Sequence, residues 1–146
     1  MGNKEFRMLC SDGDIERVQA ALDSGTDVNE EDPWGTTGLM KALIFSRNNV
    51  VQLLLNHQQI DINKVDRDGS CALHFAVLGD NHEGMAALLD RQDLTTINQM
   101  GYGGRTPIMK AVAYNSVNCF NLLLTHPDVD LDIRDDYERS PEEVRR

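Results

Sequence analysis

The chain has 146 residues, which suffice for one ordinary domain or a short array of repeats. Its formal net charge of −10 disfavours binding to nucleic acid or to an anionic membrane, because phosphate groups would be repelled. We find neither 18 consecutive apolar residues nor a secretory leader, so we expect no membrane span and no export.

The cysteine and histidine spacings predict no metal site. Cys10, Cys71 and Cys119 are odd in number and lack the CxxC pairing of a disulfide framework or a closed zinc site. The four histidines include no pair spaced i, i+4. We therefore expect no cofactor or metal, and a reducing intracellular environment, either cytoplasmic or nuclear.

The chain repeats itself at a period of 34 or 35 residues. Gly35–Ala42, Gly69–Ala76 and Gly104–Ala111 superpose without a gap, and Arg139–Pro141 begins a further copy. Between these segments recur amphipathic helical patterns that end on leucine: Gly13–Leu22, Asn49–Leu55, Gly84–Leu89 and Cys119–Leu124. Two helices per repeat are therefore expected.

Each recurring residue has a physical reason to be where it is. The glycines that open the copies fit a tight turn with positive φ: Gly35, Gly69 and Gly104. Two residues later come hydroxyl side chains that can cap a helix, namely Thr37, Thr106 and Ser140. Pro107 and Pro141 then occupy the first helical position, where the missing N–H costs nothing.

These segments resemble the ankyrin repeat, whose period is about 33 residues and whose first helix opens with T-P-L-H-x-A. Thr106-Pro107-Ile108 and Leu73–Ala76 match that opening, and Asp27-Val28-Asn29 matches the closing of the family's second helix. The resemblance implies an all-α helix-turn-helix solenoid with β-turn or hairpin tips. We expect a single domain over residues 1–146, with repeats at about 4–32, 33–66, 67–100 and 101–135, and a half repeat at 136–146.

The resemblance also implies a non-catalytic module that binds another protein or a peptide, as a scaffold, adaptor or regulator. We expect this module to be a monomer. In such arrays the turn tips and the exposed ends of the first helices form a concave binding face. Five of the eight aromatic residues fall on that side. The expected partner-binding residues are Trp34, Phe45, Arg67, Leu78, Tyr102, Arg105, Tyr114 and Tyr137. For Phe45 and Tyr114 the alternative is that they fill the core between repeats, and for Trp34 the alternative is that it covers its neighbouring turn.

Three further hypotheses arise from the residues. The unfinished last repeat could stack on another copy of the chain, giving structural self-assembly. Cys71 with His74 could form a hydrolase pair, although His74 stands where the family has a structural histidine that bonds the neighbouring turn. Leu55, Asp61, Ile62 and Asn63 resemble the pattern of asparagine hydroxylation in ankyrin proteins, which makes Asn63 a possible modification site; the alternative is that Asn63 stabilises its turn.

Overall fold

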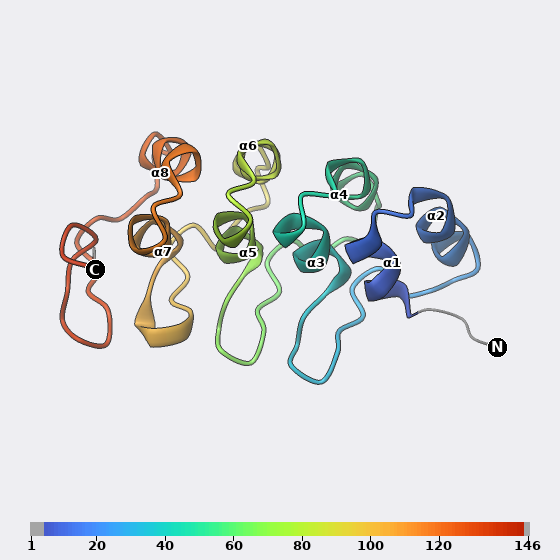
Figure 1. The fold of residues 1–146 in the computed structure, drawn as a ribbon, viewed down its shortest axis with the longest axis horizontal. Coiled ribbons are helices and arrows are strands. Elements are labelled where there is room, and N and C mark those ends of the chain that lie inside the picture. The colour runs from blue at the N-terminus through green and yellow to red at the C-terminus, as the bar shows by residue number, and fades with distance from the viewer. Residues whose placement is uncertain (1–4, 145–146) are drawn as a thin grey trace.

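The computed structural model describes residues 5–144, which fold into eight α-helices and one 3-10 turn and contain no strand beyond isolated bridges. The helices are α1 (Phe6–Asp12), α2 (Ile15–Asp23), α3 (Gly38–Ile44), α4 (Asn48–Leu55), α5 (Ala72–Leu78), α6 (His82–Leu89), α7 (Pro107–Ala113) and α8 (Val117–Leu124), and the 3-10 turn is η1 (Tyr102–Gly104). They stack as antiparallel pairs in chain order (Figure 1). The predicted all-α solenoid is confirmed.

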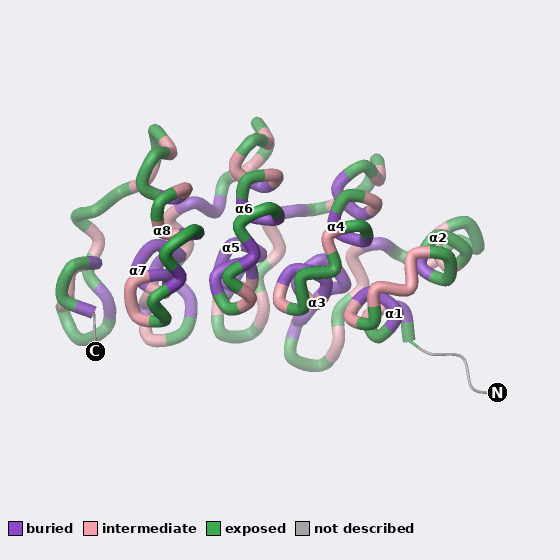
Figure 2. The backbone as a smooth tube through the Cα atoms, turned by 45° about the horizontal axis from the view of Figure 1, so that its top comes forward, coloured by how far each residue is buried: buried purple, intermediate pink, exposed green. Residues whose placement is uncertain are grey.

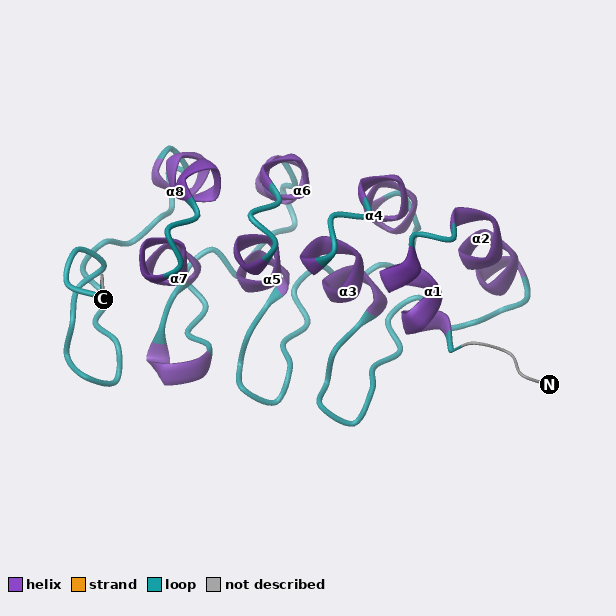
Figure 3. Cartoon of the chain, in the orientation of Figure 1, coloured by secondary structure: helices purple, strands orange, loops and turns teal. Residues whose placement is uncertain are grey.

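The pairs form two layers, with α1, α3, α5 and α7 in one and α2, α4, α6 and α8 in the other (Figure 1). Long turns without regular structure extend from the first layer, except where η1 forms (Figure 3). Leucines from both layers, such as Leu43, Leu54, Leu73 and Leu88, are completely buried. Burial of each such side chain contributes about 1.5–3 kcal/mol, so the seam between the layers is the main source of stability.

Within each pair, the helices are joined by a residue in the left-handed region. These residues are Gly13 (φ 75°), Ser46 (φ 57°), Asp80 (φ 43°) and Asn115 (φ 56°). Only the first is a glycine, so a glycine signal does not reveal this turn in the sequence. After two of these residues comes a buried polar side chain that bonds the preceding repeat. Asn81 Nδ2 donates to Leu43 O (3.1 Å), and Ser116 Oγ donates to Val77 O (2.8 Å). Each bond ties a helix pair to the pair before it.

The turns between pairs form four tips, each closed by a backbone hydrogen bond. The N–H groups of Asp32, Asp66, Gly101 and Asp135 donate to the carbonyls of Thr36, Ser70, Arg105 and Arg139, over 2.8–3.0 Å. Three tips begin with an aspartate whose carboxylate accepts two further N–H bonds. The third tip begins with Gly101, because a Cβ there would lie 2.8 Å from Ser70 Oγ and 3.1 Å from His74 Nε2. That tip forms η1 instead.

On the opposite edge, asparagines connect the outer loops. The side-chain nitrogens of Asn29, Asn63 and Asn98 donate to the carbonyls of Gln59, Asp93 and Asp128, over 2.7–2.9 Å. Their side-chain oxygens accept the N–H groups of Asp61, Thr95 and Asp130, over 2.8–2.9 Å. We call these three residues the asparagine ladder; each bonds the loop of the following repeat through both ends of its amide.

Most of the turn and capping residues expected from the sequence adopt the conformation predicted for them. Gly35, Gly69 and Gly104 have φ values of 82°, 84° and 73°, as predicted. Thr37 and Thr106 cap α3 and α7 by accepting the N–H groups of Met40 and Met109. At Ser140 the cap differs, because the Glu143 carboxylate accepts the Ser140 N–H (2.8 Å). Pro107 begins α7, whereas the segment from Pro141 to Val144 forms turns rather than a helix.

Glu138 occupies the tip position that glycine holds in the other copies, and its φ is 62°. We expect Glu138→Gly to raise the free energy of unfolding by about 0.5–1 kcal/mol, because glycine adopts this conformation without the steric cost of a Cβ. Urea denaturation followed by circular dichroism measures the change. Glu138→Ala is the matched control, since it removes the same carboxylate but keeps the Cβ. An equal gain in both variants would contradict backbone strain as the cause.

Candidate functional site

All exposed aromatic side chains of residues 5–144 lie on the first-layer helices and the tips. Trp34, Tyr102 and Tyr137 are on tips, with 68%, 74% and 74% of their surface exposed. Phe45 and Tyr114 follow α3 and α7 and are 53% and 56% exposed, so they do not fill the core between repeats. We call the tips at 32–36, 66–70, 101–105 and 135–139, together with the exposed sides of α3, α5 and α7, the aromatic face. Figure 2 shows exposed backbone positions along the turns that extend from the first layer.

The middle of this face is recessed, because it lacks the large side chain found at the same position in the repeats on either side. The position that carries Phe45 after α3 and Tyr114 after α7 is Gly79 after α5. A Cβ on Gly79 would lie 2.6 Å from Ile44 O, so α5 approaches α3 too closely for a side chain there. Leu78, at the edge of exposure, and the half-buried Phe75 therefore form the surface between the two aromatic rings.

Backbone hydrogen bonds join the first tip to the second and the third tip to the fourth. The Arg67 N–H donates to Trp34 O (3.0 Å), and the Asp136 N–H donates to Gly103 O (2.9 Å). The side chain of Arg67 is exposed. Because the main chain holds the tips together, their side chains are free of a structural role at these bonds.

Two aromatic rings of this face form cation–π contacts with basic side chains. Lys110 Nζ lies 5.4 Å from the centre of the Tyr114 ring, and the Arg139 guanidinium lies 5.0 Å from the centre of the Tyr137 ring. Contacts of this kind contribute about 0.5–1 kcal/mol at exposed sites and orient both side chains.

Arg105 is only half exposed and has a structural partner. Its Nε lies 3.9 Å from Oδ2 of Asp135, whose side chain is fully buried. Burial raises the pKa of Asp135, but the N–H groups of Arg139 and Tyr137 and the Arg139 guanidinium outweigh it, so the pKa lies below its usual value. Arg105 therefore supports the fourth tip, in addition to the partner contact predicted for it.

Cys71 and His74 are adjacent but are arranged for structure. The Cys71 N–H donates to His74 Nδ1 (2.9 Å), so Nε2 carries the proton and donates to Arg105 O (2.9 Å). Cys71 Sγ lies 3.4 Å from Nδ1, yet both residues are buried. Burial raises the pKa of the Cys71 thiol and lowers the pKa of His74 to about 4, the opposite of a thiolate-imidazolium pair. His74 bonds the neighbouring turn, as the resemblance implied.

The side-chain amide of Asn63 is fully engaged. It is the middle member of the asparagine ladder, and its oxygen accepts a further bond from Thr96 Oγ1 (3.2 Å). These contacts are those expected of a residue that stabilises its turn. Hydroxylation of Asn63 stays a prediction, and an enzyme would have to open this loop to reach the side chain.

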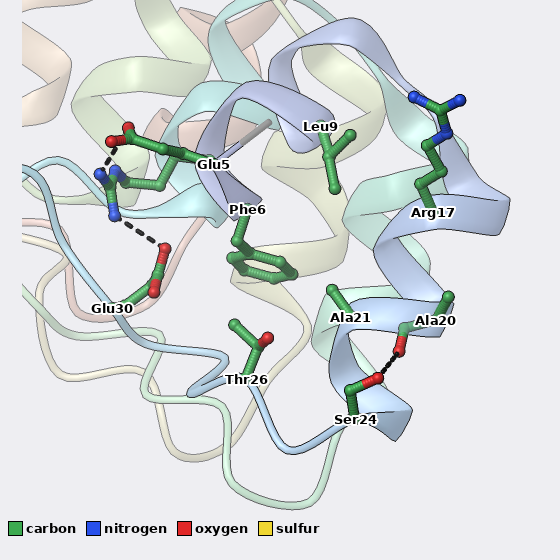
Figure 4. A pocket seen from close by; sticks show the side chains of 10 residues that line it. Glu5, Phe6, Leu9, Arg17, Ala20, Ala21, Ser24, Thr26 and Glu30 are labelled. Atoms are coloured by element: carbon green, nitrogen blue, oxygen red, sulfur yellow. Dashed lines mark hydrogen bonds and ion pairs between the residues drawn. The ribbon is translucent and has the colours of Figure 1, made fainter. Parts of the chain in front are cut away.

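Two hollows at the ends of the stack were not anticipated from the sequence. The first, of about 780 Å³, lies beside α1 and α2, where Phe6 and Leu9 accompany Ala20 and Ala21 (Figure 4). Its charged rim is already paired, since Arg7 binds Glu5 (3.0 Å) and Glu30 (2.8 Å). The second, of about 390 Å³, is lined mainly by apolar side chains: Val112, Phe120, Leu124, Leu131 and Pro141, with Ser140 and Glu142.

Among residues 5–144 no three His, Cys, Asp or Glu side chains come together as a metal site. Over the same range, no helix has the length and apolar character needed to cross a bilayer.

Comparison with known proteins agrees with this fold. The family model described as ankyrin repeats (3 copies) matches residues 6–98, and the model of the single ankyrin repeat matches residues 103–136. The chain belongs to the ankyrin repeat family.

Three curated relatives illustrate the range of this similarity. Rabankyrin-5 of Homo sapiens is 27% identical over 96% of the chain, the ankyrin repeat protein FPV031 of fowlpox virus (strain NVSL) is 34% identical over 86%, and Inversin of Gallus gallus is 33% identical over 67%. The aligned regions cover 12%, 37% and 9% of those proteins. The chain thus spans a minor part of each relative's length.

The buried neutral His74 predicts acid sensitivity. Because its folded pKa of about 4 lies below the ordinary 6.5, the unfolded chain binds a proton between these values that the folded chain does not. The free energy of unfolding should therefore fall by about 3 kcal/mol as the pH drops from 6.5 to 4. Urea denaturation across this range measures the slope, which should be much smaller in His74→Gln. The exposed His82→Gln is the control, and equal slopes in both variants would refute the assignment.

Proposed function

We propose that this protein is a non-catalytic interaction module that binds another protein or a peptide on its aromatic face. The observation that supports it best is the gathering of all five exposed aromatic side chains on one side of residues 5–144. Side chains of this type, with arginine, are enriched at the energetic centres of protein interfaces. The expected contacts are Trp34, Phe45, Arg67, Leu78, Tyr102, Arg105, Tyr114 and Tyr137.

A non-enzymatic role fits the one nucleophile-base pair that the sequence suggested. Cys71 and His74 are inaccessible, and the imidazole already donates to a backbone carbonyl. Scaffold, adaptor and regulator remain equivalent at this level, since each needs only a surface for a partner.

We further propose that residues 1–146 act as one unit of four repeats and a half repeat, in the cytoplasm or the nucleus. Consecutive repeats share the buried seam and the asparagine ladder, which supports a single unit. The three thiols are free and buried, and burial raises the pKa of Cys10 and Cys119 to about 12. Three cysteines that form no disulfide are typical of proteins in a reducing compartment.

Self-assembly is the second candidate, and the apolar hollow beside α8 favours it. Leu124 and Leu131 are 43% and 46% exposed there. Charge opposes it: residues 1–32 carry nine acidic and three basic side chains, and residues 125–146 carry eight and four. Head-to-tail and end-to-end contacts would both bring like charges together.

We therefore expect a monomer. Light scattering over a wide concentration range at physiological salt should give a mass near 16.4 kDa throughout. Leu124→Lys should leave that mass unchanged. A dimer mass that Leu124→Lys abolishes would establish assembly through the hollow and contradict the monomer.

Trp34→Ala tests the aromatic face. Its ring is mostly exposed, so the melting temperature should stay nearly unchanged, whereas the affinity for a partner should fall by at least about 1 kcal/mol. A partner is first isolated by affinity purification with mass spectrometry, and calorimetry with the purified partner then gives the affinity. Val117→Ala on α8, 54% exposed on the other layer, is the matched control. Lower stability with unaltered affinity, or an equal loss in both variants, would contradict the proposal.

A further inference from the structure

The two helical layers differ sharply in charge. The second helices and their outer loops, residues 15–29, 48–63, 82–98 and 117–132, carry ten acidic and two basic side chains. The last three first-layer helices with their following turns, residues 38–47, 72–81 and 107–116, carry three basic side chains and one acidic. The tips of the aromatic face carry six acidic and three basic side chains, so the excess of positive charge is confined to the first-layer helices between them.

The cations that lack an ion pair lie on the first-layer side. Of the lysines and arginines within residues 5–144, seven have a carboxylate within 4 Å. The other four are Lys41, Arg47, Arg67 and Lys110. Arg47 instead donates from Nε to Ser11 O (2.8 Å). This leaves Lys41 on α3, Lys110 on α7 and Arg67 on the intervening tip without a carboxylate partner.

These three cations surround the low middle of the aromatic face. The position of Lys41 on α3 corresponds to Phe75 on α5 and to Lys110 on α7, so an apolar ring lies between two ammonium groups. Helices pack about 8–10 Å apart, which places the two lysines about 16–20 Å from each other. Phe45 and Tyr114 lie one turn further along the same helices, on either side of Gly79.

We propose that the partner segment received by the aromatic face is acidic and extended, with carboxylates against Lys41, Arg67 and Lys110 and an apolar side chain over Phe75 and Leu78. This inference rests on the proposed function and specifies its ligand. At about 3.3 Å per residue, the distance between the lysines corresponds to about five or six residues of extended chain. The matching motif has acidic residues at its two ends and an aliphatic or aromatic residue near its centre.

The carboxylates of the face itself do not replace this partner. Burial lowers the pKa of Lys110 below its usual value, and it outweighs the opposite effect of Asp66 and Asp68; Arg105 lowers this pKa further. Oδ1 of Asp66 is already held by the N–H groups of Asp68 and Ser70. Asp32 and Asp135, at the bases of two other tips, are likewise held by backbone N–H groups. A half-buried ammonium without a contacting carboxylate gains more from a new one than a fully solvated ammonium does.

The experiment selects ligands without assuming a partner. A phage-displayed library of random twelve-residue peptides is panned against the protein, and fluorescein-labelled copies of the enriched peptides are titrated by fluorescence anisotropy. We expect enrichment of Asp and Glu flanking an apolar residue, and binding that weakens as salt is raised from about 0.05 to about 0.5 M. Lys41→Glu and Lys110→Glu should each weaken binding at least about tenfold. Arg17→Glu on α2, an equal charge reversal on the acidic layer, should change it less than about twofold.

Each other outcome has a definite meaning. Enrichment of basic or uncharged peptides, or an equal loss in Arg17→Glu, overturns the acidic ligand. Lysine-dependent binding to phosphatidylserine vesicles but to no peptide overturns it as well. Peptides that respond to Phe45→Ala and Tyr114→Ala but not to the lysine variants leave the aromatic face as the binding site and refute only its charge preference. Peptides that respond to none of these variants refute the proposed function itself. Circular dichroism confirms that each variant is folded.

Discussion

The structure depends on one constraint: no helix pair can bury its apolar side alone, so each must stack on the next. Leu43, Leu54, Leu73 and Leu88 are completely buried only because consecutive pairs enclose them. The cross-repeat hydrogen bonds obey the same constraint, since His74, Asn81 and Ser116 all reach into an adjoining repeat. The spacing of the repeats is thereby fixed, and with it the spacing of every side chain on the outside.

The residues that stabilise the stack are different from those expected to bind a partner. The tips are closed and aligned by main-chain bonds and by aspartates at their bases, so residues such as Trp34, Arg67 and Tyr137 are not needed to hold them. The same holds for Phe45 and Tyr114, whose rings extend from helix ends that are already packed. Substitution at these positions can therefore change a ligand preference without disturbing the stack, which is the property expected of an interaction scaffold.

Much of this was predictable from the sequence, because the signals are local and recur. The period, the glycine turns and the threonine caps each depend on a few neighbouring residues, whereas the role of His74, which bonds Arg105 O, was implied by the family resemblance. The shape of the third tip could not be predicted in this way, because Gly101 is required by Ser70 and His74, which are over 25 residues away in the sequence. The sequence also contains no signal for the positive φ values of Ser46, Asp80 and Asn115, because none of them is a glycine. The exposure of Phe45 and Tyr114 was undecided because it depends on how the first-layer helices pack against one another.

The charge difference between the layers follows from the same architecture but becomes apparent only with it. Acidic residues occur throughout the sequence, and the net charge alone suggests a uniformly negative surface. Folding places the acidic outer loops on one edge and leaves Lys41, Arg67 and Lys110 on the other side, without contacting carboxylates. Since exposed charges interact only over about a Debye length, a ligand on the aromatic face experiences these three cations and the carboxylates of the tips more than those of the outer loops. Local charge, rather than the total, therefore governs what this face can bind.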